Sequence, residues 1–485
     1  MSRKERSMDM TAGNPWGCIF RFAFPLMLAN IFQQIYTFAD TAVVGRILGM
    51  EALAALGATE WLTFLMFGAV LGLTTGLGVT VAQAWGARET DRVRQTVFHT
   101  FVLSAAAAAV LLLLGLVSLN PLIRLMGTPE EIQGAARRYL RVLYGGIPIT
   151  FAYQSAAAIL RAVGDSRTPF AAIAAASILN VLLDVWFVGI LGFGIPGAAA
   201  ATVLAQLFSA VWCLVRLKKI PELCPKGGCR WDGRLALEQL GLGIPIALQN
   251  IVTAAGGLVV QSVINGFGVL FVAGFTAANK LYGLLETAAS SYGQAMVTYS
   301  GQNVGAGQRR RLKAGMGAAA CMGCLTAFVM SAVMIVAGKE ILQCFLSGEN
   351  AGRALEIGQE FLNVLAAFFP LLYLLYILRA GVQGLGNGII PLLSGWIQLI
   401  MRVGCACLLP ALIGYQGVFW GEVLAWAGAD ALLAVSWVYL YQKTDNKKER
   451  ENDGTGKNAG GRVIRLRRQR TAGAVAQGQE ADTGL

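Results

Sequence analysis

Long apolar stretches separated by short polar loops make up most of this chain. Twelve of them are long and apolar enough to cross a bilayer as α-helices, which need about 20 residues each. Their limits are 16–44, 52–81, 95–118, 138–160, 169–191, 195–216, 240–265, 269–298, 314–338, 357–380, 390–413 and 417–441. The pattern therefore predicts an all-α membrane protein with twelve transmembrane helices.

The second half of the chain repeats features of the first half at separations of 218 to 222 residues. The corresponding positions are Pro25 and Pro245, Gln83 and Gln302, Gly86 and Gly305, Ile159–Ala162 and Ile377–Ala380, Gly164 and Gly386, and Gly197 and Gly417. Each half holds six predicted spans, so both halves enter the membrane in the same direction. We therefore expect two pseudo-symmetric six-helix bundles, related by an axis along the membrane normal.

The loops predict how these bundles are ordered and oriented. Basic residues precede the first span and follow the second, sixth and eighth spans, which places them all on one face. Cytoplasmic loops carry such an excess, so we expect both termini in the cytoplasm. The predicted order is an N-terminal segment (1–15), a first bundle (16–217), a linker (218–239), a second bundle (240–442) and a disordered tail (443–485).

Composition supports a membrane protein and narrows its partners. Apolar residues make up 56% of the chain and charged residues 14%, against about 25% charged residues in soluble proteins. The net charge of +12 lies largely in loops between spans. Basic residues in such loops orient the spans in the membrane, so we do not read this charge as a nucleic-acid binding surface. No cleavable signal pattern precedes the first span. We expect a multi-pass monomer in the plasma (inner) membrane, with no nucleic-acid partner.

The sequence lacks the motifs of the common enzyme classes. It contains no GxxxxGK[ST] phosphate loop, no HExxH pair and no dinucleotide fingerprint. Its one histidine, His99, lies within the third predicted span. We therefore expect no enzymatic activity, no bound cofactor and no direct use of ATP.

Polar side chains inside the apolar stretches are the remaining candidates for function. Asp40 lies in the first span, and a buried charge there costs a few kcal/mol. Asn180 and Asp184 lie four residues apart in the fifth span, so they share one helix face. Thr202 lies near the outer end of the sixth span. Their depths allow all four side chains to meet in the outer half of the first bundle.

Two carboxylates, an amide oxygen and a hydroxyl would form an oxygen-rich site that suits a hard cation such as sodium. Two acids close together in poor solvent also resist double ionisation, so a proton would compete with sodium. The alternative is that the acids pair with basic residues for packing. Arg138 and Arg141, at the outer lip of the fourth span, are the nearest basic candidates.

Several motifs resemble the multidrug and toxic compound extrusion (MATE) family over residues 15–442. They are FADTAVVGRILG around Asp40, VAQAWGAR at 81–88, LRAVGDSRTP at 160–169, LNVLLD at 179–184, GIPGAAAAT at 194–202 and GQNVGAG at 301–307. The resemblance implies two six-helix bundles with alternating access, and export of cationic or amphipathic compounds driven by Na⁺ or H⁺. It also implies that Asp40, Asn180, Asp184 and Thr202 carry the coupling cation.

The second half departs from one branch of that family, which places acids in spans 7 and 10. Residues 240–265 contain no Asp or Glu, and residues 357–380 contain only Glu360. The chain therefore resembles the branch that couples through the first bundle. Lys280, Glu286 and Gln294 in the eighth span, with Gln34 in the first, are candidates to line a central cavity, or else to form structural pairs.

The sequence thus predicts a secondary antiporter for organic cations or amphipathic drugs. Two alternatives remain open. A flippase for a lipid-linked oligosaccharide would share the architecture, but its cavity would be strongly basic, and the spans here are poor in Arg and Lys. A membrane scaffold without transport activity would leave the buried acids unexplained.

Overall fold

The computed structural model describes all residues except 1–7, 127, 225–228, 345–350 and 444–485. Every regular element in the described part is a helix. Residues up to Ala434 form one compact unit, and Val435 begins a second unit that continues the last helix. The arrangement below concerns the first unit.

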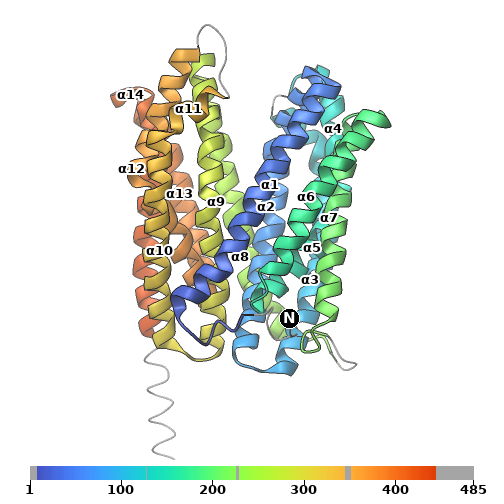
Figure 1. The fold of residues 1–485 in the computed structure, drawn as a ribbon, viewed down its shortest axis with the longest axis vertical. Coiled ribbons are helices and arrows are strands. Elements are labelled where there is room, and N and C mark those ends of the chain that lie inside the picture. Colours follow the sequence, from blue (N-terminus) through green and yellow to red (C-terminus); the bar gives the residue numbers. More distant parts are fainter. Residues whose placement is uncertain (1–7, 127, 225–228, 345–350, 444–485) are drawn as a thin grey trace, which may run out of the picture. The chain divides into compact units, whose positions relative to one another are not determined.

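The first bundle contains α1 to α7 (Figure 1). Their bounds are α1 Pro15–Leu48, α2 Met50–Gly86, α3 Thr90–Leu125, α4 Glu130–Gly145, α5 Ile147–Ala162, α6 Arg167–Asp184, a π-helix η2 Val185–Ile190, and α7 Ile195–Lys218. Helices α4 and α5 are interrupted only at Gly146. Together they supply the predicted fourth crossing, which begins earlier than residue 138.

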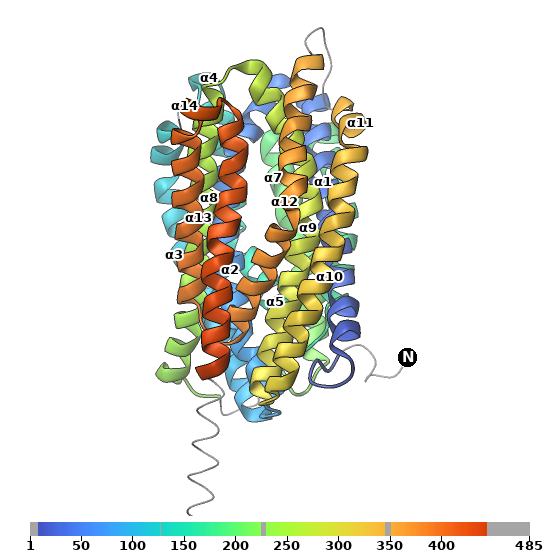
Figure 2. The same ribbon diagram turned by 90° about the vertical axis from the view of Figure 1, so that its left-hand side faces the viewer.

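The second bundle contains the remaining helices. Their bounds are α8 Gly233–Asn265, α9 Val269–Gly305, α10 Arg309–Val336, α11 Gly338–Gln343, α12 Ala351–Gly384, α13 Ile389–Leu408, α14 Pro410–Ile413 and a last helix, Gln416–Lys443. Figure 2 shows α8 beside α13, and α9 beside α10 and α12. Helix α8 begins inside the segment predicted as linker.

Ten of the described helices are long and apolar enough to cross a membrane. They match ten of the predicted spans. The predicted fourth span corresponds to the two short helices α4 and α5, and the predicted eighth span to α9, which carries more polar residues. The chain therefore has the expected all-helical membrane fold.

The first helix of each half contains a proline at the corresponding position of the repeat. Pro25 lies inside α1 and Pro245 lies inside α8. Proline has no N–H, so each helix lacks one backbone hydrogen bond at this point. Helix α1 begins at Pro15, where the side chain of Asn14 caps it by accepting from the N–H of Trp16 at 3.1 Å.

The two bundles contact each other closely along α2 and α8. A side chain at Gly72 or Gly76 of α2 would overlap the backbone of Ala247 or Gly243 of α8. Small residues at this spacing let membrane helices approach backbone to backbone. Asn250 adds a polar contact, since its Nδ2 donates to the oxygen of Gly68 at 2.9 Å. This seam holds the bundles side by side.

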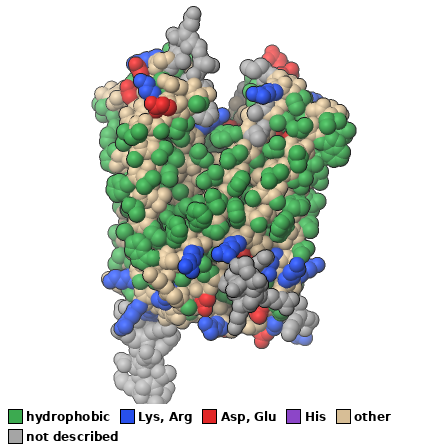
Figure 3. All heavy atoms as spheres, viewed as in Figure 1, with side chains coloured by type: hydrophobic (Ala, Val, Ile, Leu, Met, Phe, Trp, Pro, Cys, Tyr) green, Lys and Arg blue, Asp and Glu red, His purple; other side chains and the backbone are tan. Residues whose placement is uncertain are grey.

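The two ends of the bundles differ in charge and in separation. We call the end at which α1 begins the basic end; Arg88 and Arg230 lie in its loops, and Arg92, Arg310 and Arg311 lie in the first turns of α3 and α10. At the opposite end a notch separates the bundles (Figure 3). The molecule is therefore closed at the basic end and more open at the other.

A linker residue is fixed to the first bundle at the basic end. His99 is fully buried in α3, and its Nε2 accepts the backbone N–H of Asp232 at 2.9 Å. The Asp232 side chain in turn caps α8. The only histidine of the chain thus positions the start of the second bundle.

Breaking a buried ion pair near the basic end should cause a measurable loss of stability. Arg216 Nε lies 3.2 Å from Asp165 Oδ2, and the Asp165 side chain is fully buried. Arg216→Met would leave that carboxylate without its cation, so we expect a loss of about 3 kcal/mol or more. Arg92→Met, which breaks two pairs that are about half exposed, should cost at most about 1 kcal/mol. Thermal unfolding in detergent measures both; equal losses would contradict the assignment.

Candidate functional site

Helix α6 presents an amide and a carboxyl group to the interior of the first bundle. Asn180 is 1% exposed and Asp184 is fully buried, one turn apart on the same face. The Asn180 amide lies between Asp184 Oδ2 and the backbone N–H of Thr202, and the orientation that satisfies both neighbours is the one in which its nitrogen donates to Asp184 Oδ2 at 3.3 Å and its oxygen accepts the N–H of Thr202 at 3.3 Å. Asn180 therefore ties α6 to α7.

Helix α1 brings Asp40 to the same place. The carboxyl groups of Asp40 and Asp184 lie close enough to interact with each other. A hydrogen bond between two carboxyl groups requires a proton on one of them. One oxygen of each, Asp40 Oδ1 and Asp184 Oδ1, is buried and has no hydrogen-bond partner. This arrangement is the one that the predicted site for a proton or another small cation requires.

No basic side chain neutralises this pair. In the described part of the chain, neither Asp40 nor Asp184 forms an ion pair with an arginine or lysine. Arg138 and Arg141 do not pair with Asp40 either, so the packing alternative lacks its partner. Two buried acids without a counter-ion are unfavourable when both are ionised, which favours uptake of a positive charge.

Thr202 completes the set. Its backbone N–H is bound by Asn180, and its hydroxyl donates to the oxygen of Ala198 at 3.2 Å, which leaves the hydroxyl lone pairs free to accept. The described residues contain no group of three or more His, Cys, Asp or Glu side chains with metal-binding geometry. A bound sodium ion would therefore depend on the amide and hydroxyl oxygens as well. The structure brings Asp40, Asn180, Asp184 and Thr202 together, while their role stays a prediction.

Two side chains near the acids, and a third near one of these two, were missed by the sequence interpretation. Asp40 and Asp184 interact electrostatically with the phenol groups of Tyr36 and Tyr139, and Tyr139 also interacts with Glu60 of α2. Tyr36 lies one turn before Asp40, a spacing that could have revealed it. Glu60 is an acid inside a predicted span and could have been flagged as well. No sequence spacing connects Tyr139 of α4 with Asp40.

The helix that carries Asp184 changes its winding directly after it. Residues Val185–Ile190 form a π-helical turn. Such turns are rare and are frequent at functional sites, because they leave backbone groups less tightly bonded and reorient the side chains that follow. Nothing in the residue types announces this turn.

The predicted cavity residues lie on α1 and α9. The ammonium group of Lys280 lies 5.9 Å from the centre of the Phe38 ring, so the two helices meet there through a cation–π contact. Gln34 faces Gly283 of α9. Glu286 accepts a hydrogen bond from the Tyr376 hydroxyl at 2.7 Å, which directs it into the second bundle.

Other polar residues of the second bundle form structural pairs. Arg402 pairs with Glu422, and the Tyr415 hydroxyl donates to Glu360 at 2.8 Å. Asp430 belongs to neither contact, is 8% exposed, and has no hydrogen-bond partner on either carboxyl oxygen. Gln294 of α9 is partly buried, and its side chain takes part in none of the contacts described above.

Comparisons with known proteins agree with this architecture. The MatE family model matches residues 25–186 and 245–407, two ranges that begin 220 residues apart and so correspond to the internal repeat. The chain is 29% identical over 447 residues to the probable multidrug resistance protein YpnP of Bacillus subtilis, covering 90% of this chain and 97% of that protein. The probable multidrug resistance protein YoeA of the same organism is 27% identical, with 88% and 92% covered.

Solved structures show the same fold. One is described as the outward-facing conformation of a multidrug resistance MATE family transporter of the MOP superfamily. It superposes with a TM-score of 0.83 at 24% identity, covering 93% of this chain and all of that one. The twelve-helix arrangement of two bundles is thus established by fold as well as by sequence.

Proposed function

This chain belongs to the MatE family of membrane transporters, and we propose that it is an antiporter that exports amphipathic, mostly cationic compounds in exchange for Na⁺ or H⁺. The observation that carries the proposal is the carboxyl pair inside the first bundle: Asp184 is fully buried, Asp40 is partly buried, and neither has a basic partner. The names of the curated relatives, which refer to multidrug resistance, support the substrate class.

The carboxyl pair can couple the transport of the cation to the transport of the drug, because the charge of the pair depends on whether a cation is bound. With a cation bound, the pair is compatible with a closely packed first bundle. Without it, two like charges repel each other across α1 and α6, and the bundle is under pressure to rearrange. A ligand shifts such an equilibrium only by its differential affinity for the two arrangements. Cation binding and drug binding must therefore favour different arrangements.

The driving force is sufficient for useful export. Each elementary charge that moves down a potential of about 100 mV supplies about 2.3 kcal/mol. This corresponds to a substrate gradient of roughly fiftyfold, since each 1.4 kcal/mol is a factor of ten. For an uncharged drug one cation per molecule is thus enough, without ATP. Exchange of one cation for a drug with one positive charge moves no net charge, so there the concentration gradient of the cation supplies the energy, at about 1.4 kcal/mol for each tenfold gradient.

The orientation follows from the loops. The positive-inside rule places the basic end in the cytoplasm. The notch between the bundles then faces outward (Figure 3), and the structure corresponds to the state that releases drug and takes up the cation. In that state Gln34, Lys280, Glu286 and Gln294 are candidates for contact with the drug, with Phe38 as an aromatic surface.

Uptake of ethidium into inside-out vesicles tests the proposal. We expect accumulation when a sodium gradient or a pH gradient is imposed separately, with one of the two sufficient, and no accumulation when both gradients are dissipated. The control is a vesicle preparation without the protein. Accumulation that is unchanged in the absence of both gradients would overturn antiport, and transport of a lipid-linked oligosaccharide alone would favour the flippase.

A further inference from the structure

The repeated Gln-x-x-Gly motif brings the two bundles into backbone contact at the basic end. A side chain at Gly86, the last residue of α2, would overlap the backbone oxygen of Gln302. A side chain at Gly305, the last residue of α9, would overlap the backbone oxygen of Gln83. The two copies of the motif thus contact each other across the boundary between the bundles.

The glutamines of the two motifs extend this contact with nearly the same geometry. Gln83 Nε2 donates to the oxygen of Gly384 at 3.0 Å, from the first bundle to the second. Gln302 Nε2 donates to the oxygen of Ala162 at 2.7 Å, from the second bundle to the first. Gln83 thus binds the last residue of α12, and Gln302 binds the last residue of α5. These two helices correspond to each other in the internal repeat. The closure is therefore pseudo-symmetric.

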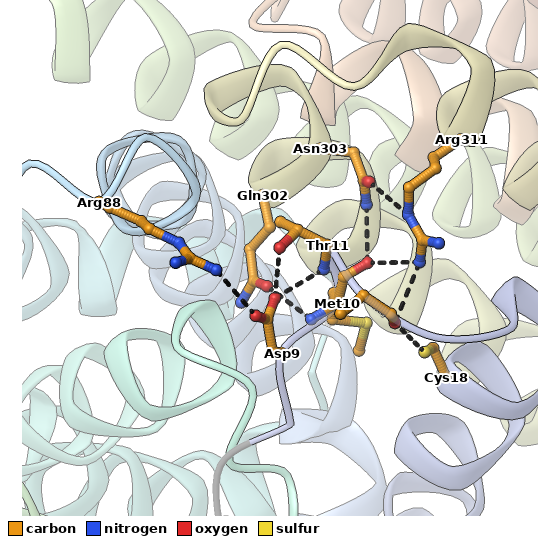
Figure 4. A network of polar contacts seen from close by, with 9 residues as sticks. Asp9, Met10, Thr11, Cys18, Arg88, Gln302, Asn303 and Arg311 are labelled. Atoms are coloured by element: carbon orange, nitrogen blue, oxygen red, sulfur yellow. Dashed lines mark hydrogen bonds and ion pairs between the residues drawn. The ribbon is translucent and has the colours of Figure 1, made fainter.

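A further segment breaks this symmetry. Residues 8–13, which we call the strap, lie over the Gln302 side of the closure (Figure 4). The N–H of Met10 donates to Gln302 Oε1 at 3.0 Å, and the Met10 side chain is fully buried. Gln302 therefore binds the first bundle with its nitrogen and the strap with its oxygen.

Arg311 and Asn303 hold the strap on the second bundle. The Arg311 guanidinium donates to the oxygens of Met10 at 3.1 Å, Ala12 at 3.2 Å and Gly13 at 2.6 Å. Asn303 Nδ2 donates to the Met10 oxygen at 3.0 Å, and Asn303 Oδ1 accepts from Arg311 Nε at 3.1 Å. Charge-assisted bonds from a planar guanidinium are strong and directional. This side of the strap is firmly attached.

The strap is held less firmly by the first bundle. The N–H of Met8 donates to the oxygen of Gly164 at 3.1 Å, and Gly164 has a φ of +91° that only glycine adopts easily. Asp9 pairs with Arg88 at 3.5 Å, with side chains 51% and 80% exposed. An ion pair this exposed contributes little. The strap is also attached to the first bundle through its continuation into α1, so the bundles can separate at this end only when the Arg311 contacts with the strap break.

We infer that the strap locks the basic end of the molecule, and that Arg311 is a positioning residue that holds the lock. The bundles cannot separate at this end while residues 8–13 bind both of them. The strap also continues through Asn14 into α1, which runs from α10 of the second bundle toward α6 of the first (Figure 1) and carries Asp40. The lock and the carboxyl pair therefore belong to one continuous segment.

The reactivity of a cysteine placed at position 82 toward a water-soluble thiol reagent tests this inference. Ala82 is 1% exposed and faces Gly301 across the boundary between α2 and α9, so a thiol there reacts only when the bundles separate. In proteoliposomes that expose the basic end, alkylation of an Ala82→Cys variant by a membrane-impermeant maleimide is followed on its own peptide by mass spectrometry. This readout separates the new thiol from the nine natural cysteines.

Adding Arg311→Gln should raise the alkylation rate at least about fivefold, because charge-assisted hydrogen bonds to the strap are lost. Arg310→Gln, which removes an exposed neighbouring charge outside the strap contacts, should leave the rate unchanged. Equal rates in these two variants would overturn the inference. The readout needs neither substrate nor ion gradient, so it stands whichever ion drives transport.

A second variant covers the case in which Arg311→Gln does not fold. Met10→Pro removes the N–H that binds Gln302 and lies outside every helix, so both bundles keep their own contacts. We expect the same rise in alkylation. An unchanged rate in a folded Met10→Pro variant would overturn the lock even if the arginine variant could not be studied.

Discussion

Asp40→Asn should abolish cation-driven export while the protein still inserts and folds. Asparagine keeps the size of the side chain but can neither carry a proton nor neutralise a sodium ion. In one-for-one exchange, each tenfold gradient of the coupling cation sustains about a tenfold gradient of substrate, and this substrate gradient should fall to about onefold. The measurement is the steady-state ratio of labelled substrate across proteoliposomes under an imposed sodium or pH gradient.

The matched control is Asp91→Asn, the same chemical change at a side chain that is fully exposed in α3. It should export like the unmodified protein. An asparagine amide can donate the hydrogen bond that a protonated carboxyl group supplies, so the unfolding temperature of Asp40→Asn should stay close to that of the unmodified protein. Gradient-dependent export that persists in Asp40→Asn would exclude the site.

Gly305→Ala should lower stability strongly, although it adds a single methyl group. That methyl group would overlap the backbone oxygen of Gln83, which cannot move without shifting α2. Overpacking of this kind costs about 1–3 kcal/mol. Thermal unfolding of the purified protein in detergent measures the effect.

Gly317→Ala serves as the control, because nothing lies within 4 Å of a side chain at that position of α10. Alanine is favoured over glycine inside a helix, so this variant should be as stable as the unmodified protein or more stable. If Gly305→Ala unfolded at the same temperature as Gly317→Ala, α2 and α9 would not be in backbone contact at the basic end.

The fold was predictable because hydrophobic length and internal repetition are properties of the sequence itself. Lipid requires that every backbone group be bonded within its own segment, so apolar runs of this length must be helices. The repeat added the two-bundle arrangement, and the family model matches the two halves at the same separation. Where α8 begins was less predictable, because its N-cap, Asp232, is positioned by a hydrogen bond to His99 in a distant part of the chain.

The candidate site was predictable in part. An acid inside an apolar run is costly, so Asp40 and Asp184 stood out by residue type alone. Tyr139 did not, because an aromatic residue at the polar edge of a span is common and its approach to Asp40 arises from tertiary packing. The π-helical turn after Asp184 and the strap at residues 8–13 likewise depend on contacts between segments far apart in the chain.

The most direct test is proton release upon drug binding. Purified protein in weakly buffered, sodium-free detergent solution is titrated with tetraphenylphosphonium while the pH is recorded. Under the proposed mechanism the carboxyl pair shares a proton in this solution and gives it up as drug binds, so the unmodified protein should release protons in proportion to the drug bound. The Asp40→Asn/Asp184→Asn variant should release none. Equal release from both proteins, or none from the unmodified one, would contradict an exchange of cation for drug at these two carboxyl groups.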